Sequence, residues 1–397
     1  MFDIEALRLN FSEYYLSDPR IFCAPGRVNL IGEHTDYNDG FVLPVAIDRA
    51  TFIAGSRRRD RLVRVISANI GEEYEFDLDN PDELPRGDWT DYVEGVARIL
   101  ESYGNRLSGA NLLIESNIPV GAGLSSSAAL EIATGFALLK LADLPIDDLT
   151  LAQAGQLTEH QYIGSKCGIM DQLISLIGRD DHAMLIDCRS HESRPVPLNL
   201  NNSVLNNSVI VICDSHVKHE LRNSAYNMRR EECSRAVELL KAQQVRIESL
   251  RDASDLISEG GYALNDFTSL LPDPINKRCR HVLTENRRTT DAADLLKGGR
   301  LKEFGKLMIE SHSSMRDDYE ISCAEMDFLV STAIIIDGVY GARMTGGGFG
   351  GCTVNLVERD ALDRFRQSIS REYHKQFGQT PTIYEIKATD GAREVRC

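Results

Sequence analysis

Apolar residues recur every three to four positions along several segments of the chain and gather in short runs along others. The first pattern is typical of helices that bury one face, and it predicts helices at residues 4–15, 91–103, 124–141, 151–162, part of 168–177, 224–242 and from 361 onward, with several helical segments between 242 and 331. The short runs predict strands at residues 41–47, 51–55, 62–67, 73–78, 111–115, 183–187, 209–213, 352–357 and 383–387, and residues 20–31 are expected to form a strand or the start of a loop. Because helices and strands are mixed, we expect an α+β protein.

A polar stretch at residues 190–208 interrupts these patterns near the middle of the chain. It contains two prolines and five asparagines, which favour turns and irregular backbone over regular structure. A chain of 397 residues is long enough for two or three domains of about 150 residues each. We therefore expect two domains, residues 1–195 and residues 196–397.

The chain is acidic, with 44 Lys and Arg residues against 60 Asp and Glu residues and a net charge of −16. Such a field repels nucleic acids and anionic membranes, so we expect neither as a partner. Nine cysteines without a C-x-x-C spacing argue against a disulfide framework and a structural zinc site. The first residues do not resemble a signal peptide and no apolar run approaches 18 residues, so we expect a cytoplasmic protein.

Residues 119–129, PVGAGLSSSAA, place two glycines and three serines between a predicted strand and a predicted helix. The first N–H groups of a helix have no partner within it, and the helix dipole adds about half a positive charge there. Gly121 and Gly123 allow the backbone to approach a ligand closely, and the serines at 125–127 add hydroxyl donors. The segment therefore predicts a site for an anion, and phosphate suits it best. The alternative is an ordinary serine-capped helix after a glycine turn.

A second glycine-rich segment, TGGGFGG at residues 345–351, contains the spacing G-x-G-x-x-G. A dinucleotide-binding fold requires a helix after this motif, but residues 352–357 predict a strand. Two interpretations stay open: a flexible turn, or a backbone that packs closely against the other domain and its ligand. The folding entropy that so many glycines lose favours the second interpretation.

Residues 26–37, GRVNLIGEHTDY, gather four ionisable side chains that do not resemble a buried core: Arg27, Glu33, His34 and Asp36. Their donors and acceptors suit a polyhydroxylated ligand. Metal binding is a weaker interpretation, because the spacing matches neither a regular zinc site nor an EF-hand. A salt-bridge cluster on the surface is the remaining alternative.

Asp171 lies among apolar residues in the segment CGIMDQL. A carboxylate in such surroundings needs a partner or becomes neutral, and Arg27 is a candidate partner. Glu159 lies twelve residues earlier on a predicted helix. Beside a phosphate site, two carboxylates suggest a base and a magnesium ligand. Asp171 could equally cap a helix.

Taken together, these segments resemble the galactokinases of the GHMP kinase superfamily. The segment GRVNLIGEHTDYNDGFVLP resembles the galactokinase signature, PVGAGLSSSAALE the phosphate loop, and RMTGGGFGGC the third motif of the superfamily. Further segments that resemble this family are CGIMDQLISLIG, HVLTENRRT and SSMRDDYE. The resemblance extends almost from end to end, and its first motif is the most specific.

The resemblance implies two lobes with the active site between them. The N-terminal lobe is expected to have a ribosomal-protein-like α+β fold, and the C-terminal lobe is expected to be related to ferredoxin-like folds. The implied activity is ATP-dependent phosphorylation of the C1 hydroxyl of α-D-galactose, with galactose and ATP as partners and Mg²⁺ as the metal. We also expect the chain to act as a monomer.

The resemblance also assigns roles by motif position. Asp171 corresponds to the catalytic base, and Arg27 to the residue that stabilises it and the transition state. Sugar contacts correspond to Glu33, His34, Thr35, Asp36 and Tyr226. The phosphate loop corresponds to Gly121, Ala122, Gly123, Leu124, Ser125, Ser126 and Ser127, and the magnesium ligands correspond to Ser127 and Glu159. Trp89 is expected near the adenine, but Thr90 and Asp91 depart from the Ala-Asn pair that often follows this tryptophan in the family, which leaves the adenine contacts open.

Two other functions stay open. One is a kinase for a related sugar such as N-acetylgalactosamine, which requires a larger pocket at the sugar 2-position. The other is a sensor that binds galactose and ATP without catalysis. Such sensors carry a damaged phosphate loop, whereas the loop in this sequence is complete.

Overall fold

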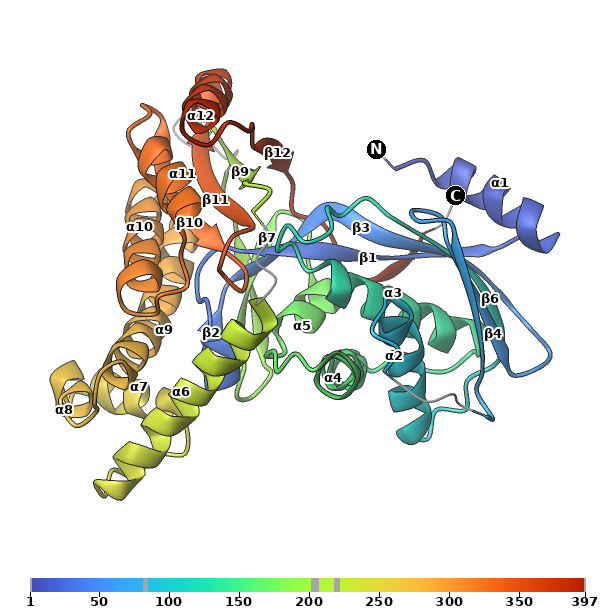
Figure 1. Ribbon diagram of the computed structural model, residues 1–397, viewed down its shortest axis with the longest axis horizontal. Helices are drawn as coiled ribbons and strands as arrows, with labels where there is room; N and C mark the ends of the chain where they lie inside the picture. Colours follow the sequence, from blue (N-terminus) through green and yellow to red (C-terminus); the bar gives the residue numbers. More distant parts are fainter. Residues whose placement is uncertain (1, 81–84, 201–206, 218–221, 396–397) are drawn as a thin grey trace.

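The computed structural model describes residues 2–80, 85–200, 207–217 and 222–395, which form two lobes (Figure 1). The first lobe is built on a six-stranded sheet with the strand order β13-β1-β3-β6-β4-β5. Its strands are β1 (Arg20–Asn29), β3 (Pro44–Arg57), β4 (Leu62–Ser67), β5 (Glu72–Asp77), β6 (Ala110–Ser116) and β13 (Arg393–Val395). All neighbours in it are antiparallel except β4 and β6.

Both faces of the first sheet are buried, because apolar side chains occupy successive positions that point to opposite sides. Ile21 packs against helix α1 (Ile4–Tyr15), whereas the next residue, Phe22, belongs to the main core on the other face. That core is covered by four helices: α2 (Thr90–Ser102), α3 (Ser126–Leu141), α4 (Asp148–Thr158) and α5 (Met170–Ile177). The sheet thereby fixes where α3 and α5 begin.

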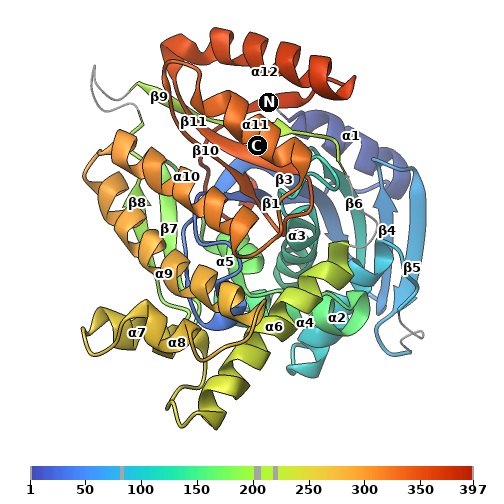
Figure 2. The same ribbon diagram turned by 60° about the vertical axis from the view of Figure 1, so that its left-hand side comes forward.

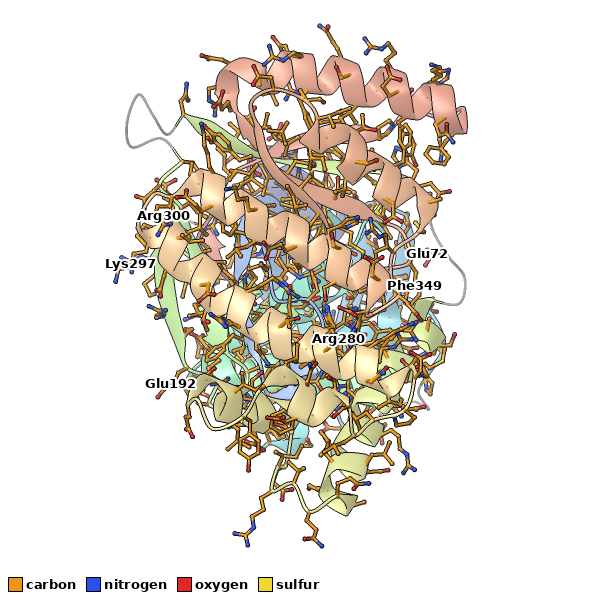
Figure 3. All side chains as sticks on the ribbon, turned by 90° about the vertical axis from the view of Figure 1, so that its left-hand side faces the viewer. Glu72, Glu192, Arg280, Lys297, Arg300 and Phe349 are labelled. Carbon is orange, nitrogen blue, oxygen red and sulfur yellow. The ribbon has the colours of Figure 1, made fainter. Side chains whose placement is uncertain are left out.

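The second lobe is built on an antiparallel four-stranded sheet with the order β10-β11-β9-β12. Its strands are β9 (Ser208–Asp214), β10 (Val339–Thr345), β11 (Cys352–Glu358) and β12 (Thr382–Ile386). Its helices are α6 (Arg222–Ala242), α7 (Leu250–Ser258), α8 (Leu264–Thr268), α9 (Ile275–Lys297), α10 (Leu301–Asp317), α11 (Ala324–Ile334) and α12 (Leu362–Phe377) (Figure 2). Lys297 and Arg300 mark the outer connection between α9 and α10 (Figure 3).

One of the hydrophobic clusters contains residues of both lobes. Along β9, Val211 belongs to a cluster with helices α11 and α12, whereas Ile210 and Ile212 belong to a cluster on the opposite side. This second cluster also contains Val28 and Leu30 of the first lobe. Because buried side chains pack at crystal-like density, this shared core holds the lobes in a defined arrangement.

A small third sheet lies between the first lobe and helix α9 of the second, and one of its strands belongs to the segment GRVNLIGEHTDYNDGFVLP. It has the order β2-β7-β8 and consists of β2 (Phe41–Val42), β7 (His182–Asp187) and β8 (Ser193–Pro197). Residues 193–197 were expected to belong to an irregular junction, and this expectation is wrong for them because they pair with β7. Residues 201–206 of that stretch lie outside the described residues, and the boundary between residues 195 and 196 stays a prediction.

Most predicted elements form within a few residues of their predicted ends, with three notable differences. The predicted strands at 41–47 and 51–55 are wrong as separate units: from Pro44 onward they form the single strand β3, which pairs with β1 along its length and with β6 over its second half. The helix predicted at 151–162 begins earlier, because Asp147 caps it, and ends in a π-helical turn, Glu159–Ile163. Strands β10 and β13 were not predicted.

Short 3-10 turns, Asp36–Asn38 and Arg359–Ala361, complete the described elements. Within the described residues, none of the helices combines the length and the apolar character needed to cross a bilayer.

Candidate active site

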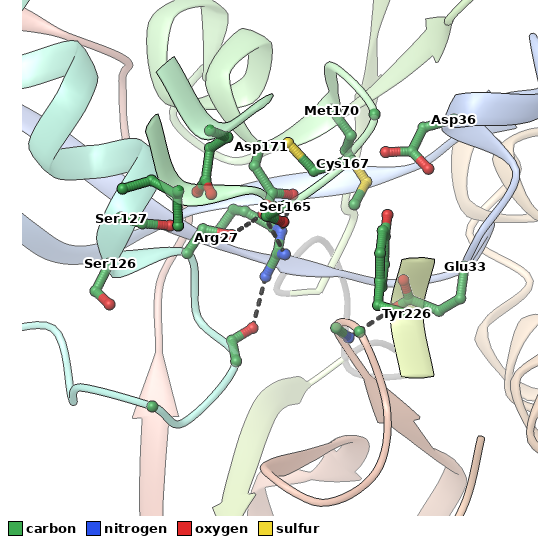
Figure 4. Close-up of a pocket in the computed structure, with 18 of the residues that line it drawn as sticks. Arg27, Glu33, Asp36, Ser126, Ser127, Ser165, Cys167, Met170, Asp171 and Tyr226 are labelled. Carbon is green, nitrogen blue, oxygen red and sulfur yellow. Dashed lines mark hydrogen bonds and ion pairs between the residues drawn. The ribbon is translucent and has the colours of Figure 1, made fainter. Parts of the chain in front are cut away.

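One cavity of about 370 Å³ collects nearly all the sequence motifs (Figure 4). A volume of this order suits a small-molecule ligand. Most of its lining comes from β1, the loop at residues 32–41 (the acidic loop), the loop at 119–125 (the glycine loop), the start of α3, the start of α5, and the loop at 346–351 (the second glycine loop). Helices α2 and α6 and the segment from the π-helical turn to residue 168 supply the rest. The lining residues are Arg27, Glu33, His34, Asp36, Tyr92, Val120, Gly121, Gly123, Ser125, Ser126, Ser127, Glu159, Ile163, Ser165, Cys167, Gly168, Met170, Asp171, Tyr226, Gly346 and Gly347.

Arg27 and Asp171 form a bidentate ion pair in this cavity, as the sequence suggested. Arg27 Nε donates to Asp171 Oδ1 (2.7 Å) and Nη2 donates to Oδ2 (2.6 Å). The Arg27 side chain is 6% exposed and that of Asp171 27% exposed, so only the carboxylate is open to a ligand. Burial disfavours the charged guanidinium, but Asp171 outweighs this effect and raises the pKa of Arg27.

The backbone before Arg27 explains how the pair reaches the glycine loop. The pairing of β1 with β3 shifts register between Pro25 and Arg27. A Cβ on Gly26 would lie 2.6 Å from Leu124 O, so only glycine permits this approach. Arg27 N then donates to Leu124 O (3.1 Å), and Arg27 Nη1 donates to Gly123 O (2.7 Å). Arg27 therefore fixes both the Asp171 carboxylate and the glycine loop.

The glycine loop leads into α3 through three residues with positive φ: Gly121 (78°), Gly123 (78°) and Ser125 (59°). Helix α3 begins at Ser126, two residues later than predicted, because Ser125 is in the left-handed region. The Ser125 side chain does not cap α3. Its hydroxyl donates instead to Asp171 Oδ2 (2.5 Å). The alternative of an ordinary serine-capped helix is therefore wrong, and the helix start faces the cavity.

Acidic side chains outnumber basic ones in the cavity lining. Burial, reinforced by Asp171, raises the pKa of Asp36 to about 7. Burial also raises the pKa of Glu159 to about 7, although a hydrogen bond from Ser127 favours the charged form. Beneath them, burial and the nearby Glu159 raise the pKa of Glu131 well above its ordinary value. The cavity therefore holds protons that a bound cation would displace.

Within the described parts of the chain, no group of three or more His, Cys, Asp or Glu side chains is placed to hold a metal ion. Ser127 and Glu159 nevertheless bring a hydroxyl and a carboxylate together at the start of α3. Magnesium is commonly held by one or two carboxylates, water and substrate phosphates. The donor set fits a magnesium ion that a phosphate ligand helps to bind.

Glu33 connects the acidic loop to the second glycine loop. Its Oε1 accepts from Gly346 N (2.9 Å) and Thr345 Oγ1 (3.1 Å) and lies 3.3 Å from Arg343 Nη2. All these groups are buried. Of the two interpretations of the second glycine segment, close packing against the other lobe is thus confirmed: a Cβ on Gly351 would lie 3.2 Å from Ala122 O of the glycine loop.

Side chains of α9 hold the backbone of the acidic loop. Gly32 N donates to Glu285 Oε1 (3.0 Å), and Phe41 N donates to Asn286 Oδ1 (2.9 Å). His281 Nε2 hydrogen-bonds Glu33 O (3.1 Å). Both ends of the loop are therefore fixed by the second lobe before a ligand binds.

The remaining predicted residues divide into two groups. Tyr226 lines the cavity, and its ring centroid lies 4.9 Å from that of His34. Thr35 does not line the described cavity and is fully buried. Its hydroxyl contacts Gly32 O (2.9 Å) and Phe41 O (2.7 Å) within the acidic loop. Ala122 and Leu124 are likewise buried in the core, and Trp89, also outside the lining, donates from Nε1 to Glu72 Oε2 (2.7 Å).

Sequence reasoning assigned no site role to several residues of the lining, among them Tyr92, Ile163, Ser165, Cys167 and Met170. Tyr92 lies on α2 and gives the same apolar signal as its core neighbours. Ser165 and Cys167 follow the π-helical turn, whose change of helical period the sequence pattern does not reveal. Their position next to the Asp171 segment was the one available signal.

Comparison with known proteins is consistent with this geometry. Residues 9–57 match the galactokinase galactose-binding signature, residues 91–179 the GHMP kinases N terminal domain, and residues 292–375 the GHMP kinases C terminal domain. A galactokinase from Roseiflexus sp. (strain RS-1) is 48% identical over 100% of this chain and 98% of its own length. A galactokinase from Haemophilus influenzae (strain ATCC 51907 / DSM 11121 / KW20 / Rd) is 44% identical over 94% of each chain.

Solved structures agree. The galactokinase of Lactococcus lactis, crystallised in complex with galactose, superimposes with a TM-score of 0.92 at 36% identity, covering 99% of this chain and 100% of that one. The mevalonate kinase of Methanococcus jannaschii shares the fold, with a TM-score of 0.64 at 19% identity over 94% of this chain and 99% of that one. With a glycine loop, a buried ion pair and an acidic loop around one cavity, and relatives of this similarity over its whole length, the chain belongs to the galactokinase family within the GHMP kinases.

Proposed function

We propose that this protein transfers the γ-phosphoryl group of ATP to the C1 hydroxyl of α-D-galactose, giving galactose 1-phosphate and ADP. The observation that carries the proposal is the position of the Arg27–Asp171 ion pair, in one cavity with both the acidic loop and the glycine loop. A sugar hydroxyl that reaches Asp171 from the acidic-loop side would meet a phosphate held at the start of α3.

In this proposal, Asp171 accepts the proton of the C1 hydroxyl as its oxygen forms a bond to the γ-phosphorus. The bond from that phosphorus to the bridging oxygen breaks, and ADP leaves with the electron pair. The transition state for such a transfer is loose, so positioning and charge neutralisation dominate the catalysis. Arg27 supplies a fixed positive charge beside the transferred group, and the backbone N–H groups at the start of α3 supply donors.

The roles of the other residues follow from their place in the cavity. His34, Asp36 and Tyr226 contact the sugar. Glu33 holds the second glycine loop beside the sugar site by accepting from Gly346 N. Gly121 and Gly123 of the glycine loop, with the serines at 125–127, surround the phosphates. Magnesium would be held by Ser127 and Glu159 and would neutralise phosphate charge.

A coupled assay for ADP, run with galactose and ATP in the presence of Mg²⁺, tests the proposal. A panel with N-acetylgalactosamine and 2-deoxygalactose separates a galactokinase from a kinase for a related sugar. A non-catalytic sensor would bind galactose and ATP without producing ADP, and that outcome would overturn the proposal.

The Asp171→Asn variant tests the proposed base. It should lower kcat by about 10²-fold or more, because general-base catalysis typically contributes 10²–10⁴-fold. The neutral amide keeps the shape of the side chain, so galactose should still bind, which calorimetry can measure. Near-normal turnover would show that Asp171 is not the base.

A further inference from the structure

Four aromatic rings from both lobes meet on the acidic-loop side of the cavity: His34, Tyr37, Tyr226 and Tyr319, here called the aromatic cluster. The ring centroid of His34 lies 4.9 Å from that of Tyr319, 4.9 Å from that of Tyr226 and 5.6 Å from that of Tyr37. His34 and Tyr226 line the cavity. Tyr319 lies behind them, just after α10, and is fully buried.

A continuous chain of hydrogen bonds runs through this cluster, away from the cavity. His34 Nδ1 lies 2.6 Å from Tyr37 Oη, and Tyr37 Oη lies 2.8 Å from Tyr319 Oη. Tyr319 Oη in turn lies 3.0 Å from the Sγ atom of Cys233 on α6. Burial raises the pKa of Tyr37 and of Tyr319 well above the ordinary value, so both phenols keep their protons.

Because each phenol carries one proton, the chain can run in only two directions. In one, Tyr37 donates to His34 Nδ1, Tyr319 donates to Tyr37, and the Cys233 thiol donates to Tyr319. In the other, every donor and acceptor is exchanged. The separation of 2.6 Å between Tyr37 Oη and His34 Nδ1 is typical of an O–H donor and short for an N–H donor. It favours the first direction, in which the phenol donates to the ring nitrogen.

The direction of the chain fixes the chemistry that His34 offers to a ligand. A neutral imidazole carries its proton on one nitrogen only. If Nδ1 accepts from Tyr37, the proton resides on Nε2, and the ring presents a donor instead of an acceptor with that atom. A sugar hydroxyl can accept from such a donor.

We propose that Tyr319 is a positioning residue for sugar recognition, which acts by holding Tyr37 as a donor to His34 and so fixes His34 as the tautomer protonated on Nε2. The proposal rests on the proposed function in naming the sugar as the ligand. It assigns a role in specificity to Tyr319, a residue of the second lobe that is not part of the described cavity lining.

The Tyr319→Phe variant tests this role with little risk to folding. The ring of Tyr319 is held by packing on His281, at 4.4 Å between centroids, and phenylalanine keeps that contact. Only the hydroxyl is removed. The KM for galactose should rise about 5- to 10-fold, the range expected for one net hydrogen bond. The kcat and the KM for ATP should stay within about twofold, because the ion pair and the glycine loop are untouched.

Tyr340→Phe is the matched control. Tyr340 also donates its hydroxyl to a side chain, Glu358 Oε1 (2.6 Å), but it lies at the far end of β10 from the second glycine loop. This variant should leave both KM values unchanged. An equal rise in the KM for galactose in both variants, or a fall in kcat with unchanged KM in Tyr319→Phe, would overturn the proposal.

Nitrogen NMR of isotope-labelled histidine gives a readout that does not depend on activity. The His34 resonances, assigned with a His34→Gln variant, should show Nδ1 unprotonated and Nε2 protonated in the wild type. A mixture of tautomers should appear in Tyr319→Phe. If the wild type shows the proton on Nδ1, or if the tautomer does not change in the variant, the proposal fails. A protein with the expected tautomer but no galactose phosphorylation would instead overturn the proposed function.

Discussion

The acidic loop and the glycine loop line the same cavity, but they are held in different ways. The acidic loop is buried and fixed at several points by side chains of the second lobe, among them Glu285, Asn286 and Tyr319. In the glycine loop, Val120 is 77% exposed, and the loop is fixed at its far end through Arg27. The difference matches the two ligands proposed here.

A neutral sugar is recognised by the placement of donors and acceptors, which must be set before it binds, because misplaced hydrogen bonds in a dry site are costly. A triphosphate with its cation is highly charged, and its electrostatic attraction to helix N–H groups and charged side chains is strong. Its binding loop therefore needs to be held less rigidly before the ligand binds. The acidic side chains of the cavity, with pKa values raised by burial, make the phosphate side dependent on that cation.

The Arg27→Lys variant should have the largest effect, because Arg27 holds both Asp171 and the glycine loop. A single ammonium group cannot hold both oxygens of Asp171 and also Gly123 O. We expect kcat to fall on the order of 10²-fold, as when a fixed donor is removed from a transition-state site, with little change in the KM for galactose. Steady-state kinetics measure this. A rise in KM at unchanged kcat would make Arg27 a binding residue.

The Glu285→Gln variant tests the fixing of the acidic loop. Burial alone would raise the pKa of Glu285, but Arg288 and Arg343 outweigh it and lower the pKa to about 2. Removing the charge leaves these arginines buried without it, so the free energy of unfolding at pH 7 should fall by about 3 kcal/mol. Urea denaturation measures this loss.

Because the folded-state pKa of Glu285 is depressed, its contribution is complete above the ordinary pKa of Glu and is lost as the pH falls toward 2. The two proteins should therefore become more alike in stability at low pH. The KM for galactose should rise more than the KM for ATP. Glu303→Gln, which removes an exposed partner of Arg300, is the control and should leave stability unchanged. Equal stability of Glu285→Gln and wild type would show that the loop is not held by this carboxylate.

The smallest effect concerns the phosphate side and is read from the pH dependence of metal binding. Burial raises the pKa of Glu159 to about 7, so below this pH the carboxyl must lose a proton before it can bind a cation. The affinity for Mg·ADP should rise with pH up to about 7, by at most about tenfold per pH unit, and then level off. Calorimetry from pH 5.5 to 8.5, a range chosen about that pKa, measures it. The Glu159→Gln variant should bind more weakly and show a flat profile, and a profile like that of wild type would remove Glu159 from the proposed metal site.

The sequence predicted the local elements well, because periodicity depends on neighbours along the chain. It also indicated Arg27 as the partner of Asp171, since a carboxylate among apolar residues requires one. It could not predict the contacts of α9 with the acidic loop. His281 and Glu285 lie about 250 residues from the acidic loop in the sequence. Their helical pattern does not indicate which distant backbone groups they contact.

The same limit explains two other misses. Thr35, expected at the sugar, shares a motif with true lining residues, yet its side chain turns into the loop. Strand β13 has only three residues and forms by pairing with β1, so it carries little pattern of its own.

Strand β13 also has a consequence for the order in which the protein is made. The chain leaves the first lobe after β8, builds the second lobe, and returns at residues 393–395 to pair along β1. During translation, β1, which carries Arg27, therefore waits with part of one edge unpaired until nearly all of the second lobe has left the ribosome. An unpaired edge is a template for pairing with another chain. A nascent chain that stalls before residue 393 therefore has a first sheet with an unpaired edge that can still associate with another chain.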